Sequence, residues 1–337
     1  MYSAGIIGCG DIAGGYDERS GAPGVYTHAG AYRKSGRVQV KAAADINAAR
    51  LQSFARYWGI DRTFASYEEL IQKGPYDIVS VCTPDRTHSE IISRLIENKA
   101  ARVIFAEKPL AMSVAEANQV VQNAESAGIE IILNHQRRWE PHHLRLRDFL
   151  RSGGIGIVQS ACAYYVKGLF HIGGTVVDTI RYLIDDVDSV LALPPTDRGS
   201  LPDDPTISFV LFLKNGAKAV MLGGDQFGQK YGIFELDILG TEGRVRYLDE
   251  GHRFNFYAVE EFSHYPGFQE LVAKPERETT TELNFAVHRV VEHIIGLLQS
   301  GGGDVTNSAR EGLRDILILE SIKDSIGRGF QIVKVPE

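Results

Sequence analysis

Residues 4–15 read AGIIGCGDIAGG, and this stretch decides the fold of the N-terminal half. The apolar run from Ala4 to Ile7 is followed directly by Gly8, Gly10 and the small Ala13. This spacing matches G-x-G-x-x-G/A, in which the first glycine permits a tight turn and the second lets a pyrophosphate approach the backbone. The small third residue allows a helix to pack closely against the strand, and the N-terminus of that helix favours phosphates. The stretch predicts a dinucleotide-binding strand–turn–helix, with an ordinary glycine-rich turn as the alternative.

Four more apolar runs follow within the first 135 residues, and all are rich in Val, Ile and Ala, as is typical of strands buried on both faces. They are Val38–Ala44, Asp77–Cys82, Val103–Ala106 and Glu130–Leu133. Between them, Ser66, Thr87 and Ser113 each precede a Glu by three residues, the pattern of a helix N-terminus. Gly74 and Gly128 stand where helices should end. This alternation predicts an α/β domain over residues 1–135, with a doubly wound parallel sheet.

From residue 136 onward the pattern changes to long strand-like runs. They are Ile157–Val166, Ile207–Leu213, Ala217–Leu222 and Phe234–Leu239. Hairpin turns are expected at Asn215–Gly216 and Glu242–Gly243, and helices over about 173–184 and 309–326. We therefore expect a second, α+β domain over residues 136–337, with a large, mostly antiparallel open sheet. Its last helix would pack back on the first domain, and the proline-containing stretch 193–205 would be a surface loop.

Composition excludes several classes of function. The 337 residues include 36 Lys and Arg against 43 Asp and Glu, so the net charge is −7. This acidic balance argues against nucleic-acid binding, because neutralising phosphates needs clustered basic residues. No apolar run approaches the ~18 residues of a membrane span, and the N-terminus lacks the basic start of a signal peptide. Cys9, Cys82 and Cys162 lie far apart, which predicts no disulfides, no metal site and a cytoplasmic protein.

The second predicted strand ends at Asp45, where a carboxylate can bind the hydroxyl groups of a ribose. Because such a carboxylate repels a 2′-phosphate, Asp45 favours NAD over NADP. Asp45 lies further from Gly10 than the usual ~20 residues, which residues 15–27 explain if they are an insertion. The alternative is an ordinary helix N-cap, and nearby Arg50 could weaken the discrimination.

Polar residues also follow two later strands. Glu107, Lys108 and Pro109 come at the end of the run that begins at Val103, where ligands gather in α/β proteins. A lysine in such a crevice can exchange protons with a substrate hydroxyl, whereas the alternative is a surface Glu–Lys pair in a turn. The segment 134–139, NHQRRW, follows the next strand and is either part of the same crevice or a hinge between domains.

The helix expected over 173–184 has an apolar face of Val and Ile residues, with a different stripe on the opposite side. That stripe consists of His171, Thr175, Asp178 and Tyr182. An imidazole, a carboxylate and two hydroxyls suit ligand binding, and Gly173–Gly174 would let a ligand approach the backbone. The alternative is an ordinary polar face. A pocket for a polyhydroxylated molecule would be formed by Arg137, Tyr165, Lys167, His171, Asp178 and Tyr182.

Five segments, in this order, resemble the Gfo/Idh/MocA family, named after glucose–fructose oxidoreductase and inositol dehydrogenase. They are GCGDIA, AAADIN, VSVCTPDRTH, VIFAEKPLAMS and NHQRRW. The resemblance implies a Rossmann domain and a second domain whose open sheet mediates dimer or tetramer contacts. It also implies NAD(P)-dependent oxidation or reduction of a secondary alcohol or carbonyl on a sugar, nucleotide sugar or cyclitol.

The same resemblance assigns roles to individual residues. Gly8, Gly10, Asp11 and Ile12 would contact the pyrophosphate, and Asp45 the adenosine ribose. Thr83, Pro84 and His88 would line the cofactor groove. Glu107 and Lys108 would approach the nicotinamide ribose and the reacting carbon, and Asn134 would lie near the nicotinamide.

The chain departs from the family at the catalytic motif, which usually reads D-x-G-x-H. With Gly173 in register, His171 stands at the usual Asp position and Thr175 at the usual His position. A threonine cannot act as a general base near neutral pH without activation. The chain is therefore expected to be an active enzyme in which His171 or Lys108 takes the proton, with Thr175 and Asp178 binding substrate. The alternative is a dinucleotide-binding sensor or assembly subunit without turnover.

Overall fold

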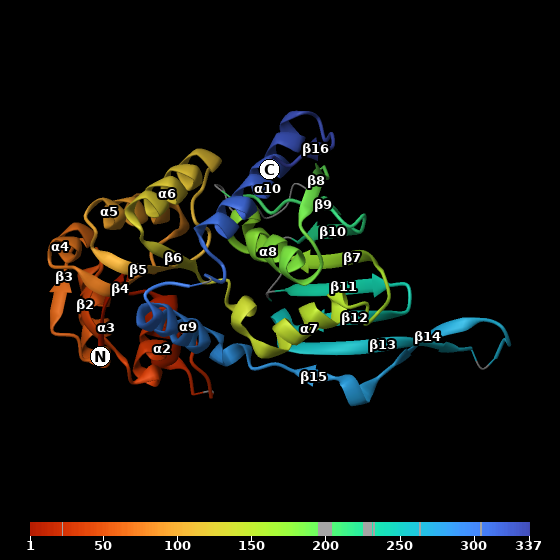
Figure 1. Ribbon diagram of the computed structural model, residues 1–337, viewed down its shortest axis with the longest axis horizontal. Helices are drawn as coiled ribbons and strands as arrows, with labels where there is room; N and C mark the ends of the chain where they lie inside the picture. The colour runs from red at the N-terminus through yellow and green to blue at the C-terminus, as the bar shows by residue number, and fades with distance from the viewer. Residues whose placement is uncertain (22, 195–203, 225–230, 232, 263, 304) are drawn as a thin grey trace. The chain divides into compact units, whose positions relative to one another are not determined.

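The computed structural model describes all residues except 22, 195–203, 225–230, 232, 263 and 304 (Figure 1). It divides into two compact units. Unit 1 comprises residues 1–139 and 284–316, and unit 2 comprises residues 140–283 and 317–337. This differs from the contiguous division expected from the sequence, because residues 284–316 return to complete the N-terminal unit.

Among the described residues, unit 1 contains a six-stranded parallel sheet in the order β3-β2-β1-β4-β5-β6. The strands are β1 (Tyr2–Ile7), β2 (Val38–Ala44), β3 (Arg62–Phe64), β4 (Tyr76–Val81), β5 (Ala101–Ala106) and β6 (Glu130–Leu133). The doubly wound parallel sheet is thus confirmed, whereas short β3 was not expected from the sequence. The strand order reverses between β1 and β4, and a crevice opens beyond the carboxyl ends of strands at such a point.

The helices of unit 1 are α1 (Tyr16–Arg19), α2 (His28–Ser35), α3 (Ala48–Trp58), α4 (Tyr67–Gln72), α5 (His88–Glu97), α6 (Val114–Ala127) and α9 (Ala286–Ser300). Two expected N-caps are confirmed, since the side chains of Ser66 and Ser113 accept hydrogen bonds from the first turns of α4 and α6. The cap expected at Thr87 is wrong. Its hydroxyl donates instead to the Pro84 carbonyl oxygen at 2.7 Å, within the turn that precedes α5.

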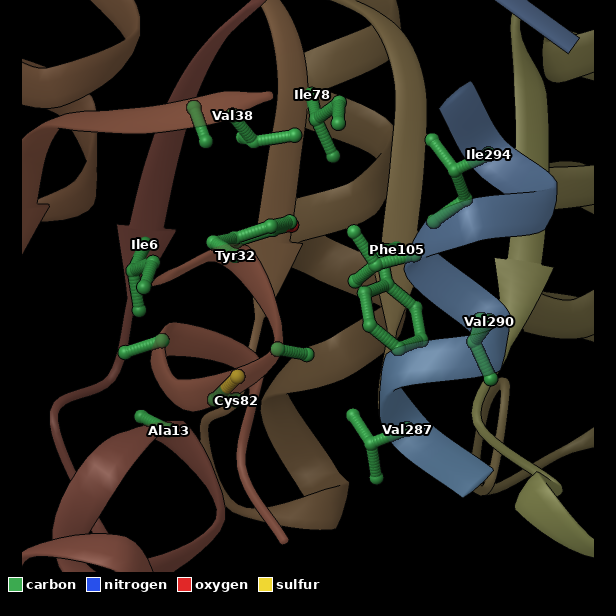
Figure 2. Close-up of a cluster of buried hydrophobic side chains, with 14 of the residues drawn as sticks. Ile6, Ala13, Tyr32, Val38, Ile78, Cys82, Phe105, Val287, Val290 and Ile294 are labelled. Atoms are coloured by element: carbon green, nitrogen blue, oxygen red, sulfur yellow. The ribbon is translucent and has the colours of Figure 1, made fainter. Parts of the chain in front are cut away.

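Helix α9 completes the core of unit 1, although the sequence analysis did not anticipate it. Figure 2 shows Val287, Val290 and Ile294 of α9 beside Phe105 of β5, and all four side chains are fully buried. Burying one side chain of this kind stabilises a fold by about 1.5–3 kcal/mol. The sheet of unit 1 therefore depends on a helix far along the chain.

In the part of the chain that the structure describes, unit 2 holds a ten-stranded sheet in the order β14-β13-β12-β11-β7-β10-β9-β8-β16, with β15 paired to β13. The strands are β7 (Val158–Tyr165), β8 (Val187–Ala192), β9 (Phe209–Leu213), β10 (Lys218–Gly223), β11 (Phe234–Gly240), β12 (Gly243–Leu248), β13 (Arg253–Glu261), β14 (Gln269–Ala273), β15 (Thr279–Thr280) and β16 (Val333–Lys334). The pairings are antiparallel except between β7 and β10, which confirms the large, mostly antiparallel sheet. Both expected hairpin turns are present, between β9 and β10 and between β11 and β12.

Helices α7 (Pro141–Arg151) and α8 (Gly174–Leu183) belong to unit 2, whereas α10 (Ala309–Gly327) begins in unit 1 and ends in unit 2. The helix expected over 173–184 is confirmed as α8, but every residue of α8 is buried. Its polar stripe is therefore not an exposed face. Most of the loop expected over 193–205 lies outside the described residues. Of the helices that the structure describes, none has both the length and the hydropathy needed to cross a bilayer.

Candidate functional site

A groove of about 430 Å³ opens in unit 1 where β1, β2 and β4 end. Its lining includes Gly8, Gly10, Asp45, Thr83 and Pro84, so the fold brings these predicted cofactor residues together. Gly8 has φ +85°, and a Cβ there would lie 2.7 Å from the Cys82 carbonyl oxygen. At Gly10, by contrast, a Cβ would meet no described atom within 4 Å. The tight turn at Gly8 and the open backbone at Gly10 fit a bound pyrophosphate.

The Asp45 carboxylate is held at one end of this groove. Its Oδ2 accepts a hydrogen bond from the Cys9 backbone N at 2.8 Å, and its Oδ1 accepts one from Asn47 N at 2.7 Å. The helix-cap alternative for Asp45 is wrong, because Asn47 caps α3 through a bond from Arg50 N at 3.0 Å. The Arg50 guanidinium lies 3.7 Å from Asp45 Oδ2 and also lines the groove. The groove therefore places a basic group beside the carboxylate that is expected to bind the ribose.

The other predicted cofactor residues are not among the groove-lining residues; they are Asp11, Ile12, His88, Glu107, Lys108 and Asn134. Asp11 is exposed and pairs with Arg19 at 2.6 Å, and Ile12 packs against the core. His88 is fully buried. Its ring nitrogens lie 2.7 Å from the Pro109 carbonyl oxygen and 2.8 Å from that of Thr83. His88 thus joins the turn after β4 to the turn after β5.

Glu107 is buried at the end of β5, directly before Lys108, and the peptide bond between Lys108 and Pro109 is cis. Its Oε1 accepts hydrogen bonds from His28 Nε2 at 3.1 Å and from Asn134 Nδ2 at 2.7 Å. Burial, the largest effect, raises the pKa of Glu107. The hydrogen bonds from His28 and Asn134 and the charge of Lys108 outweigh it and hold this pKa below its usual value. Sequence reasoning missed His28, which follows the expected insertion.

In unit 2, the backbone of the candidate base His171 is fixed by a residue that sequence reasoning also missed. Asp204 accepts hydrogen bonds from Phe170 N at 2.9 Å and from His171 N at 3.0 Å. Both belong to the short π-helical segment Gly168–Gly173, which precedes α8. Lys167, just before it, has φ +69° and an exposed side chain. No sequence pattern pointed to Asp204, because it lies in the stretch expected to be a loop.

The remaining substrate candidates differ in their surroundings. Asp178 and Thr175 are buried, and Thr175 Oγ1 has no hydrogen-bond partner among the described residues. Tyr182 is buried, with the Arg147 guanidinium 5.1 Å from the centre of its ring. Arg137, which belongs to unit 1, is partly exposed.

Two expectations about this region are corrected. Tyr165 is fully buried, and its hydroxyl donates to the Ile207 carbonyl oxygen and accepts from Ile207 N, so it serves the core. Gly173 is explained by packing, because a Cβ there would lie 3.2 Å from the Tyr165 ring. A Cβ at Gly174 would lie 3.4 Å from Leu319, which is an ordinary contact. Gly173 therefore does not require a ligand to account for it.

The parallel sheet, the glycine turn and the groove at the strand-order reversal together define a dinucleotide-binding Rossmann unit. Residues 2–135 match the model of an oxidoreductase family described as having an NAD-binding Rossmann fold. The matching model is that of the Gfo/Idh/MocA oxidoreductases, and the match lies within the N-terminal stretch of the chain. The resemblance noted in the sequence is thereby confirmed.

Two relatives are distant from this chain in sequence. A D-apiose dehydrogenase of Rhizobium rhizogenes is 22% identical over 86% of this chain and 88% of its own length. A myo-inositol 2-dehydrogenase of Thermotoga maritima is 25% identical over 60% of this chain and 66% of its own. Among solved structures, a levoglucosan dehydrogenase in complex with NADH and L-sorbose superposes with a TM-score of 0.79 at 18% identity. That match covers 100% of this chain and 99% of the other, and shows a shared fold.

Proposed function

We propose that the chain is an NAD-dependent dehydrogenase or reductase that acts on a secondary alcohol or carbonyl of a sugar, nucleotide sugar or cyclitol. The observation that carries this proposal is the groove of unit 1, with open backbone at Gly10 and a fixed carboxylate at Asp45. The names of the relatives, which act on apiose and inositol, support the substrate class. Polar candidates in unit 2, such as Lys167 and Asp178, suit a molecule with many hydroxyls.

The residues that would hold the cofactor are Gly8, Gly10, Asp45, Thr83 and Pro84, with Glu107 and Asn134 toward the nicotinamide. A bound nicotinamide supplies a hydride acceptor or donor. The chain's own task is then to move the hydroxyl proton, for which we assign Lys108 or His171 as the base. Thr175 would bind substrate without titrating, because a hydroxyl does not ionise near neutral pH. Asp178 would orient the base or contact the substrate.

The test is a titration of the purified protein with NADH and, separately, NADPH, followed by energy transfer from tryptophan to the nicotinamide. Micromolar NADH binding with much weaker NADPH binding is the expected result, and it would justify a screen of polyols and nucleotide sugars. If neither cofactor bound, the dehydrogenase proposal would be overturned.

Asp45→Ala should narrow the ratio of NADH to NADPH affinity by roughly tenfold or more, the scale of one hydrogen bond to a charged group. The reason is that the carboxylate binds ribose hydroxyls and repels a 2′-phosphate, whereas alanine does neither. The same two titrations measure the ratio, and Asp61→Ala, an exposed acidic residue before β3, is the matched control. An unchanged ratio would assign the choice of cofactor to Arg50 or another residue.

The open sheet of unit 2 is proposed to mediate a homodimer or homotetramer. Tyr164 of β7, Leu222 of β10 and Leu239 of β11 lie on its outer face, and they are 49%, 36% and 40% exposed. Tyr164 and Leu222 are register partners, so they form a continuous apolar patch.

The free state of all three cysteines supports a reducing compartment such as the cytoplasm.

The double variant Tyr164→Glu with Leu222→Glu is expected to lower the mass in solution to that of a monomer, because charges buried at an interface are unfavourable. Light scattering coupled to size-exclusion chromatography measures the mass. Ile332→Glu changes another exposed apolar residue of unit 2 and should leave the mass unchanged. A wild-type monomer would rule out this role of the sheet.

A further inference from the structure

A chain of buried polar groups leads from Glu107 into the core of unit 1. Tyr32, Ser80 and His28 are each 0% exposed. The Tyr32 hydroxyl lies 2.7 Å from Ser80 Oγ, and Ser80 Oγ lies 2.9 Å from His28 Nδ1. His28 Nε2 then lies 3.1 Å from Glu107 Oε1. Burying a polar group is unfavourable unless it finds a hydrogen-bond partner. A connected chain of such groups in the core therefore needs an explanation.

The direction of each hydrogen bond follows from the acceptor at the end of the chain. An ionised Glu107 only accepts, so His28 Nε2 donates to it. In the neutral ring, Nδ1 then accepts from the Ser80 hydroxyl, and Ser80 Oγ accepts from Tyr32. Every hydroxyl and ring hydrogen of the chain is thereby used once. The arrangement selects one tautomer of His28.

The His28 ring is held in place from several sides. It stacks on Phe105 of β5, with ring centroids 4.0 Å apart. The residue before it, Thr27, caps α2 by accepting from Gly30 N at 3.1 Å, and its hydroxyl donates to Asp17 Oδ2 at 2.6 Å. The backbone of His28 is therefore fixed at the start of α2, and its ring is held by Phe105 and by the hydrogen bonds to Ser80 and Glu107.

The chain does not lead to water. Its far end, Tyr32, is fully buried, and burial raises the pKa of the Tyr32 hydroxyl well above its usual range. Besides Tyr32, the titratable groups that act on His28 or Glu107 are Cys82 of β4, whose thiol pKa is raised by burial, and Lys108. A proton delivered to His28 would have no exit along this route. The arrangement therefore suits holding a group in place rather than conducting protons.

We propose that His28 is a positioning residue, which fixes the Glu107 carboxylate in one orientation beside Lys108 through the chain Tyr32–Ser80–His28. The inference rests on the proposed function in so far as Lys108 acts on substrate. Glu107 directly precedes Lys108 and interacts with it electrostatically, so the orientation of the Glu107 carboxylate contributes to the field at the Lys108 amine. His28 acts only through Glu107 and does not touch substrate.

The test compares His28→Leu, which removes the donor to Glu107, with His28→Gln, whose amide keeps one. His28→Leu is expected to lower kcat by on the order of 10- to 100-fold, as for the loss of one hydrogen bond to a charged group. NADH affinity should stay within a few-fold, and His28→Gln should restore much of kcat. Tyr32→Phe removes only the far end of the chain, so it should lower kcat less than His28→Leu does.

The pH profile separates positioning from structure. The pKa of Glu107 is held low, so its charge is present above that pKa and is lost as the pH falls through it. Without the His28 donor this pKa rises, and the acidic limit of kcat/KM moves to higher pH. A purely structural role would lower the melting temperature without moving this limit. A His28→Leu enzyme with wild-type kcat and pH profile would overturn the proposal.

Two further measurements keep the proposal testable if His28→Leu does not fold or if no substrate is found. Nitrogen NMR of histidine-labelled wild-type protein should show His28 with hydrogen on Nε2 only, and this readout needs no activity. Ser80→Ala should lower kcat less than His28→Leu would and leave the hydrogen of the ring on Nε2, because Glu107 still accepts it. A His28 ring protonated on Nδ1 alone would overturn the proposal, whereas failure of NADH binding would overturn the proposed function instead.

Discussion

Replacing Lys108 by alanine is expected to abolish turnover while leaving NADH affinity within about tenfold, ~1.4 kcal/mol. Lys108 directly follows the buried Glu107 at the end of β5. Its amine is one of the two groups assigned to take the substrate proton. The groove residues that would hold the dinucleotide, such as Gly10 and Asp45, are unchanged in this variant. Single-turnover kinetics with the fluorescence titration separate the two effects.

Two further variants make this experiment more specific. Lys108→Arg keeps the positive charge but cannot give up a proton near neutral pH, so it should be inactive if Lys108 is the base. Lys34→Ala, an exposed lysine of α2, should behave as wild type. Undiminished turnover in Lys108→Ala would remove Lys108 from the mechanism.

His171→Asn is expected to lower kcat by roughly 10²-fold or more, the usual scale for the loss of a general base. An imidazole titrates near neutrality, whereas an amide keeps hydrogen bonding and cannot accept the proton. The backbone bond from His171 N to Asp204 is independent of the side chain, so the segment before α8 should keep its place. Steady-state rates across pH 5–9 measure the effect, with His264→Asn, an exposed histidine of unit 2, as control.

The outcomes of the two series together identify the base. A fully active His171→Asn enzyme would leave His171 a positioning role or none and would assign the proton to Lys108. If the rate of His171→Asn no longer changes with pH while Lys108→Arg is still active, the proton transfer would be assigned to His171. A wild-type protein that binds NADH without turnover on any polyol or nucleotide sugar would favour the non-catalytic alternative.

Short sequence patterns predicted much of unit 1, because the residues that cause each structure lie close together in the sequence. The caps at Ser66 and Ser113 need only the serine side chain and the backbone N–H three residues later. Thr87 failed as a cap because its backbone is in the helical region, with φ −103° and ψ −5°, whereas a capping residue is extended. Helix α9 escaped notice because its many β-branched residues also suit strands. The spacing of its buried residues, among them Val287, Val290 and Ile294, is nevertheless that of a helix.

The site was predictable where a motif fixes the backbone and not where a distant residue supplies the partner. The glycine turn at Gly8 and the carboxylate at Asp45 follow from their places at strand ends. His28 and Asp204 meet Glu107 and His171 only after folding, across long separations in sequence. Tyr165 was misassigned because alternation along β7 does not reveal which hydroxyl finds a partner in the core.

The place of α9 in the core of unit 1 has a consequence for synthesis on the ribosome. Residues 1–139 leave the ribosome first, but the helix that packs on Phe105 begins at Ala286. At about 5–20 residues per second, the intervening segment takes on the order of ten seconds to translate. During that time the apolar face that α9 covers is open to chaperones and to other nascent chains. Translation therefore sets the order of folding. Unit 1 begins to fold first, and its core is completed only after α9 has been synthesised.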